Sequence, residues 1–219
     1  VAMNVPEHTV NTQFSGSWAN NMWQGRIKAS SLKLANMNWS LASPFDVQVA
    51  TTPMSAAIST HCWVSRNEGQ LCIDTFNVEN NNAQWKLAAN LLPVGLWAHE
   101  LFPEWVTSNV PATLTAASQG SYSSNGDIDA QFNASLSSAT WQLGKARPID
   151  ITINAIETEG SMKQGKLSAR SIIKSDDLGH AELNVSVHPF EENIPLDGML
   201  VINNIDVSPL KPLFAIKPE

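Results

Sequence analysis

The sequence predicts an all-β fold, and three observations point to it. Apolar and polar residues alternate with a period of two over many short segments, as in strands with one dry and one wet face. The gaps between these segments contain turn-forming pairs such as Asn125-Gly126 and Asp197-Gly198. Two stretches of the chain also repeat the same landmarks. We therefore expect a curved antiparallel sheet (a trough, half-pipe or open barrel) of two tandem similar units, with one short helix between them.

The strand patterns follow the chain in order. In the first half they cover residues 27–34, 45–49, 57–64, 71–78 and 83–89, and in the second half residues 128–136, 149–153, 166–173 and 181–187. Together with shorter segments this indicates roughly a dozen strands, whose short connections predict antiparallel pairing.

One segment breaks the period of two. Between Pro93 and Pro103, apolar residues recur at helical spacing, at Val94, Trp97, Ala98 and Leu101. We expect this helix to plug one end of the sheet, because such a stripe favours burial. Trp97→Ala would then cost about 3–5 kcal/mol. The alternative is that Trp97 and Trp105 form an interaction surface for a partner. A second turn is expected over residues 209–214.

The repeat is carried by glycine, tryptophan and proline at corresponding places: Gly16 and Gly120, Trp39 and Trp141, and Pro44 and Pro148. It predicts repeat units over residues 10–105 and 112–214 within one domain of residues 1–219. We expect Trp39 and Trp141 to be core residues in equivalent places, and the same equivalence for Pro44 and Pro148.

The composition limits the function. The chain has 219 residues, 43% of them apolar, which is enough for a core. A net charge of −7 argues against a nucleic-acid partner or an anionic membrane surface. No stretch approaches the ~18 apolar residues that span a bilayer. Since the numbering does not open with Met, we expect an export signal or membrane anchor to have been removed.

Two cysteines, Cys62 and Cys72, flank a turn-like run at residues 65–69. We predict a disulfide between them across a hairpin, which implies an oxidising compartment. Two unpaired thiols are the alternative. A zinc site is disfavoured, because no nearby pair of histidines completes a tetrahedral set.

No catalytic arrangement is evident. The string beginning at His99-Glu100 has Pro103 where a zincin needs its second histidine. The adjacent carboxylates Asp176-Asp177 and Glu191-Glu192 are typical of solvated turns. We therefore expect no enzyme activity, no metal and no cofactor.

The chain also contains eight tryptophans. They suit either a packed core or an exposed aromatic platform for sugars or peptides.

Several short motifs resemble the type II secretion system protein N family. In the first half they are residues 23–26 (Trp-Gln-Gly-Arg), Leu32, Leu34 and residues 39–44, from Trp39 to Pro44. In the second half they are Gly120, residues 141–144, residues 165–167 and 177–179, and residues 209–214. The cysteine pair is not part of the family pattern.

This resemblance implies a periplasmic domain behind one N-terminal inner-membrane helix in a Gram-negative bacterium. It implies an accessory part in protein export, with other secretion-system proteins as partners and no catalytic residues. The family is similar to AsmA-like proteins, whose curved antiparallel sheets form an apolar-lined trough.

Three functions follow as hypotheses. The first is a non-enzymatic component of the type II secretion system. The second is a periplasmic module that binds lipid or another amphiphile in an apolar groove, and the third is a carbohydrate-binding β-sandwich. The position of the apolar residues discriminates among them, because an open apolar groove favours ligand carriage and tryptophans on an outer face favour sugar.

Overall fold

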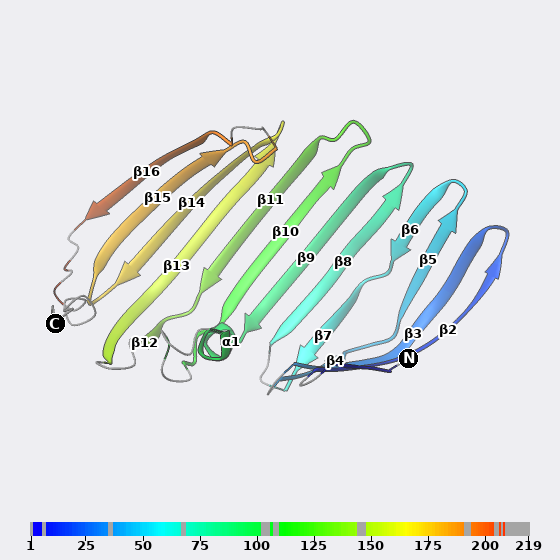
Figure 1. Cartoon of the computed structure of the whole chain (residues 1–219), viewed down its shortest axis with the longest axis horizontal. Helices are drawn as coiled ribbons and strands as arrows, with labels where there is room; N and C mark the ends of the chain where they lie inside the picture. Colours follow the sequence, from blue (N-terminus) through cyan, green and yellow to red (C-terminus); the bar gives the residue numbers. More distant parts are fainter. Residues whose placement is uncertain are drawn as a thin grey trace, which may run out of the picture. The chain divides into compact units, whose positions relative to one another are not determined.

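The computed structural model describes residues 2–5, 8–34, 37–66, 69–101, 106, 110–143, 148–190, 194–203, 206 and 208. These residues form sixteen strands and one α-helix, which confirms the predicted all-β, antiparallel fold (Figure 1). Trp105 and the turn expected over residues 209–214 lie outside the described residues.

The chain divides into two compact units, and neither is one continuous stretch. Unit 1 comprises residues 1–92, 116–132 and 162–164, and unit 2 comprises residues 93–115, 133–161 and 165–219. Strands β10 (Leu114–Tyr122) and β11 (Ile128–Leu136) contribute residues to both units.

Unit 1 is built from hairpins. Its strands are β1 (Ala2–Val5), β2 (His8–Ala19), β3 (Met22–Leu34), β4 (Met37–Leu41), β5 (Phe45–Thr51), β6 (Met54–Ile58), β7 (His61–Ser65), β8 (Gln70–Glu79) and β9 (Asn82–Leu92), followed by parts of β10 and β11. The turns joining β2 to β3 and β8 to β9 are Asn-Asn pairs with positive φ at both residues, as two-residue hairpin turns require.

Two strand positions in unit 1 are each shared by two short strands. Strand β3 pairs with β5 through its first half and with β4 through its second half. On the far side, β8 pairs with β6 and then with β7. The strand structure is interrupted at residues 42–44, between β4 and β5, and at residues 59–60, between β6 and β7.

These interruptions align with bulges in the neighbouring long strands. The pairing of β2 with β3 skips Lys28, and the pairing of β8 with β9 skips Asp74. We call this line across the sheet (Lys28, residues 42–44, residues 59–60 and Asp74) the bend line. Bulges bend a strand and increase its twist, and Figure 1 shows β2 and β3 changing direction along their length.

Backbone groups freed along the bend line find other partners. The amide of Ala42 donates to the carbonyl of Cys62 (2.8 Å), and the amide of Ser59 donates to the carbonyl of Asp46 (3.0 Å). The hydroxyl of Thr60 donates to the carbonyl of Asp74 (2.8 Å). The break therefore leaves these polar groups satisfied.

Unit 2 contains β12 (Ala139–Leu143), β13 (Ile149–Lys163), β14 (Lys166–Ser175), β15 (Gly179–Val187) and β16 (Leu196–Asn203). In sheet order they run β13-β14-β15-β16, with β12 paired on β13. The helix α1 spans Val94–Leu101, as the proline-bounded apolar stripe predicts.

Helix α1 packs on a small core of unit 2. Buried Val106, Val110, Ala112 and Ala139 form this core, and Val94 and Ala98 of the helix pack against it with Leu136, Trp141 and Leu143. The helix therefore covers apolar residues, as the plug hypothesis expects, through Val94 and Ala98. Trp97 is half-buried and is not part of this cluster.

Among the described residues, no helix combines the length and apolar character needed to cross a membrane.

Candidate functional site: an uncovered apolar face

Strand pairing in unit 1 aligns apolar residues in rows across the sheet. One row crosses six strands at Gly16, Gly25, Val47, Ile58, Phe76 and Trp85. The next crosses the same strands at Trp18, Trp23, Val49, Ala56, Val78 and Ala83. Because directly paired residues share a face of the sheet, these rows form one apolar face.

The same face continues beyond the bend line. There, Val10 pairs with Leu32 and Leu32 with Trp39. A second row runs from Leu41 through Trp63 and Leu71 to Ala89. The bulges at Lys28 and Asp74 each insert one extra residue, which compensates for a shift in the apolar alternation of the sequence at these points. Apolar side chains therefore stay on the same face of the sheet on both sides of the bend line.

In the part of the chain that the structure describes, no second layer packs on this face. Among the described residues, none of the large side chains is fully buried, and seven apolar residues count as buried. Phe14 and Trp18 keep 53% and 56% of their surface exposed. A contiguous exposed apolar patch on a folded protein marks an interaction or ligand-binding surface.

Several polar groups on the apolar face have hydrogen-bond partners within the chain. The hydroxyls of Thr12 and Ser30 lie 2.7 Å apart, and the indole N–H of Trp85 donates to the hydroxyl of Ser118 at 3.3 Å. His61 is buried, stacks on Phe45 with ring centroids 3.7 Å apart, and has its Nδ1 2.9 Å from the carbonyl of Ser59. An apolar ligand could therefore cover this face without stripping these groups of their partners.

The opposite face of unit 1 is polar. Its exposed residues include Arg26 and Asp46, paired at 3.4 Å, and Lys86, paired with Asp74 at 3.5 Å. A shallow hollow of about 380 Å³ in this unit is lined mainly by polar residues of β8 to β11. The rows of unit 1 named above contain no charged residue, so the sheet is sharply two-sided.

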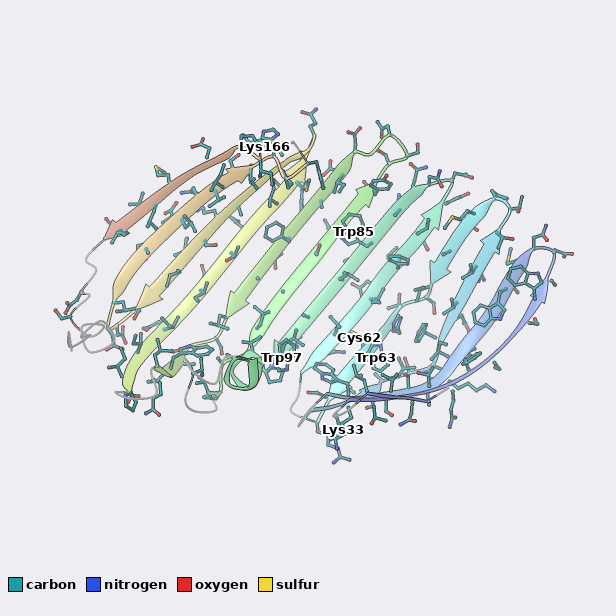
Figure 2. The ribbon with its side chains drawn as sticks, viewed as in Figure 1. Lys33, Cys62, Trp63, Trp85, Trp97 and Lys166 are labelled. Atoms are coloured by element: carbon teal, nitrogen blue, oxygen red, sulfur yellow. A yellow bond between two sulfur atoms is a disulfide. The ribbon has the colours of Figure 1, made fainter. Side chains whose placement is uncertain are left out.

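The predicted disulfide is present. Cys62 on β7 and Cys72 on β8 are directly paired and bonded, with an S–S distance of 2.07 Å. Cys62 lies between His61 and Trp63 along β7, and its partner Cys72 shares its face, which places the disulfide on the polar side of the sheet. Figure 2 labels Cys62 and its neighbour Trp63.

Unit 2 has an apolar face of its own. Its rows join β14, β15 and β16 at Leu167, Val187 and Leu196; at Ser171, Leu183 and Leu200; and at Ile173, Ala181 and Ile202. The hydroxyls of Thr158 and Ser171 lie 2.9 Å apart, so a polar pair again satisfies itself. Leu196, Leu200 and Ile202 are exposed.

On the polar side of unit 2, Arg170 forms a charge cluster. Its Nε and Nη2 donate to the carboxylate of Glu182 at 2.8 and 3.1 Å, and Glu159 lies 3.9 Å away. The hydrogen bond with Glu182 raises the pKa of Arg170. Hydrogen bonds from Arg170 and then Asn184 lower the pKa of Glu182 to about 2. These groups hold adjacent strands together, and no reactive centre lies beside them in the described region.

The tryptophans of the repeat are found in differently paired strands. Trp39 is buried in β4, and Trp141 in β12 packs on the core under helix α1. Pro44 and Pro148 precede β5 and β13, but β4 and β5 both pair with β3, whereas β12 folds back on β13. β4 and β5 therefore run in the same direction on either side of Pro44, whereas β12 and β13 run in opposite directions. The two halves of the chain differ at this point.

The sequence patterns alone do not mark the residues that shape the apolar face of unit 1. Trp23 and Gly25 belong to a motif that resembles a known family, and Gly16 belongs to the repeat. Their positions about the Asn20-Asn21 turn held the signal, because a two-residue hairpin turn pairs Gly16 with Gly25 and Trp18 with Trp23.

Comparison with known proteins places the chain in a family. A family model described as "TamB, N-terminal domain" matches residues 2–216. No curated protein and no solved structure matched the chain. The match corrects the resemblance to type II secretion system protein N, with which this family shares only the AsmA-like superfamily. The short apolar motifs behind that resemblance reflect strand and turn chemistry that such sheets have in common. The chain belongs to the TamB N-terminal domain family, within the AsmA-like superfamily.

Proposed function

We propose that this chain is a non-enzymatic periplasmic module that binds the acyl chains of a lipid, or of a similar amphiphile, along its apolar face. The observation that carries the proposal is the row from Gly16 to Trp85, where apolar side chains are aligned across six strands without a covering layer. Acyl chains match such a surface because burying apolar area contributes roughly 25 cal/mol per Å².

Two further points support the proposal. The TamB family connection favours a periplasmic role related to lipid or protein transport over a part in type II secretion. The disulfide suits an oxidising compartment, as the periplasm is.

The carbohydrate hypothesis is less well supported. Sugar sites combine aromatic rings with free hydrogen-bonding groups that fix the hydroxyls. In the described structure, Trp18, Trp23 and Trp85 lie on the apolar face, where Ser118 already accepts the Trp85 N–H.

Lipid binding is measured with the purified, oxidised chain and phosphatidylethanolamine labelled with nitrobenzoxadiazole, followed by fluorescence. Val47→Asp places a carboxylate at the centre of the row, and a lipid chain covering it would remove water from that charge. We expect at least about tenfold weaker binding, equivalent to ~1.4 kcal/mol.

The matched control is Gln48→Asp, which introduces the same carboxylate one residue away on the exposed polar face. We expect its affinity to stay within about twofold of wild type, since 0.4 kcal/mol or so is the scale of a remote surface change. Equal binding by Val47→Asp and Gln48→Asp, or no binding by the wild-type chain, contradicts the proposal.

A further inference from the structure

The indole of Trp23 lies over two paired glycines on the apolar face. Gly16 of β2 and Gly25 of β3 are directly opposite each other. A Cβ added at Gly16 would lie 2.6 Å from Cζ2 and 2.7 Å from Cε2 of Trp23. At Gly25, the three atoms nearest to an added Cβ all belong to the Trp23 ring. The ring therefore occupies the space that side chains would fill at both positions.

A second tryptophan repeats this arrangement at the other end of the row. A Cβ at Gly120 of β10 would lie 2.5 Å from Cζ2 of Trp85 on β9. The N–H of Trp85 donates to Ser118, two residues before Gly120 on β10, which holds the ring over that strand. Figure 2 labels Trp85 on β9. Both indoles thus lie along the sheet, where the facing residue lacks a side chain.

We propose that Gly16 and Gly25 are positioning residues that keep the Trp23 indole flat, so that an acyl chain can lie along the row and against the ring. This inference rests on the proposed function. Glycine weakens a strand by lost entropy, and its use inside a strand is typical where another group approaches the backbone closely. Here the approaching group is an indole, which covers the glycines and presents its face to the ligand.

Gly25 offers the cleanest test. A Cβ added at Gly16 also lies 2.7 Å from the backbone oxygen of Gln24, and one added at Gly120 lies 2.7 Å from the backbone oxygen of Asp129. At Gly25, the three atoms nearest to an added Cβ all belong to the movable Trp23 side chain. Gly25→Ala is therefore expected to push the Trp23 ring away from the sheet, so that the ring obstructs the path of an acyl chain along the row. The pairing of the strands should be unchanged.

The matched control is Gly198→Ala on β16. Gly198 pairs with Val185 on the apolar face of unit 2, and an added Cβ there lies 3.5 Å from the nearest atom, an ordinary contact. The chemical change is the same, but no ring has to move. Circular dichroism and thermal melting establish that both variants fold.

The experiment measures affinity for nitrobenzoxadiazole-phosphatidylethanolamine and quenching of tryptophan fluorescence by a phospholipid with dibrominated acyl chains. We expect Gly25→Ala to weaken binding at least about fivefold and Gly198→Ala by less than about twofold. We expect Trp23→Phe to remove part of the quenching seen in the wild-type chain, because the brominated chain contacts that ring.

A double variant separates positioning from simple strand damage. If Gly25 acts through Trp23, adding Gly25→Ala to Trp23→Leu has no further effect on affinity, within about twofold. An equal loss from Gly25→Ala in both backgrounds overturns the inference, as does wild-type affinity in Gly25→Ala itself. If Gly25→Ala binds normally while Val47→Asp does not, the inference fails and the proposed function stands. If the wild-type chain binds no lipid, both fail.

Discussion

At the scale of single residues, the Arg170–Glu182 pair couples stability to pH. The folded-state pKa of Glu182 is lowered from 4.5 to about 2, chiefly by its hydrogen bond with Arg170. A lowered carboxyl pKa stabilises the folded state above the unfolded-state pKa, and the contribution is lost as the pH falls through the folded-state value.

We therefore expect Glu182→Gln to melt at a lower temperature than wild type at pH 7, by a small amount because the pair is partly exposed. The difference should shrink as the pH falls from about 4.5 to about 2. Thermal melts at several pH values test this. Glu159→Gln, whose carboxylate lies 3.9 Å from Arg170, is the control and should show a smaller difference. A pH-independent gap between wild type and Glu182→Gln would show that the ion pair is not its cause.

The disulfide also makes a prediction at the residue scale. The unreduced, denatured protein should contain close to zero free thiols, because Cys62 and Cys72 are bonded. Replacing both with Ser should lower the free energy of unfolding by roughly 2–3 kcal/mol, the range for closing a short loop. Thiol titration and urea denaturation provide the measurements. Two titratable thiols per unreduced chain would contradict the pairing.

At the scale of elements, helix α1 depends on a close approach. Gly95 is buried, its amide donates to the carbonyl of Ala112 at 3.1 Å, and an added Cβ would collide with the backbone of Val110. Two effects oppose each other at this position. Ala favours a helix over Gly by up to about 1 kcal/mol, whereas overpacking a tight contact costs typically about 1–3 kcal/mol.

We expect the steric effect to dominate, so that Gly95→Ala lowers the free energy of unfolding by about 1–2 kcal/mol. Urea denaturation measures it. A variant more stable than wild type would show that the helix does not approach Val110 this closely. Trp97→Ala, expected from the sequence to cost about 3–5 kcal/mol, should cost less, because Trp97 is only half-buried and lies outside the cluster.

The bend line shows how element boundaries depend on long-range pairing. Pro44 accounts for one break, since proline lacks an amide for the ladder. The local sequence does carry a sign of both bulges, because the apolar alternation changes phase there, from Ile27 to Leu32 in one strand and from Ile73 to Phe76 in the other. The strand register then identifies Lys28 and Asp74 as the residues skipped in the pairing.

At the scale of the whole molecule, each unit has an apolar face, and no second layer packs on either face among the residues that the structure describes. The native protein should therefore bind the dye anilinonaphthalene sulfonate, as molten globules do, yet keep the near-ultraviolet circular dichroism of fixed tryptophans and unfold cooperatively. Val47→Asp in unit 1 and Leu183→Asp in unit 2 should each reduce dye binding, while Gln48→Asp should not. Dye binding that is absent in the wild type, or unchanged in both apolar-face variants, would mean that these faces are covered in solution.

The sequence by itself determined the class of structure. Alternation with a period of two set the two-sided strands, Asn125-Gly126 set a tight turn, and the apolar stripe between the prolines at 93 and 103 set the helix. These are local properties, because side-chain direction and turn geometry follow from neighbouring residues. The hairpin spacing of Cys62 and Cys72 was informative for the same reason. The turn expected at Asp197-Gly198 is wrong, because both residues lie within β16 and pair with β15.

Only the tertiary structure decided that the apolar faces are left uncovered among the described residues. A period of two does not distinguish a strand packed in a sandwich from one that leaves its dry side open, since the burial of a face depends on whether another layer covers it. The register between β2 and β3 also brings Gly16 opposite Gly25, where the ring of Trp23 lies over both. Pairing across strands joins residues that are distant in sequence, and a single side chain's local pattern carries no record of its partner.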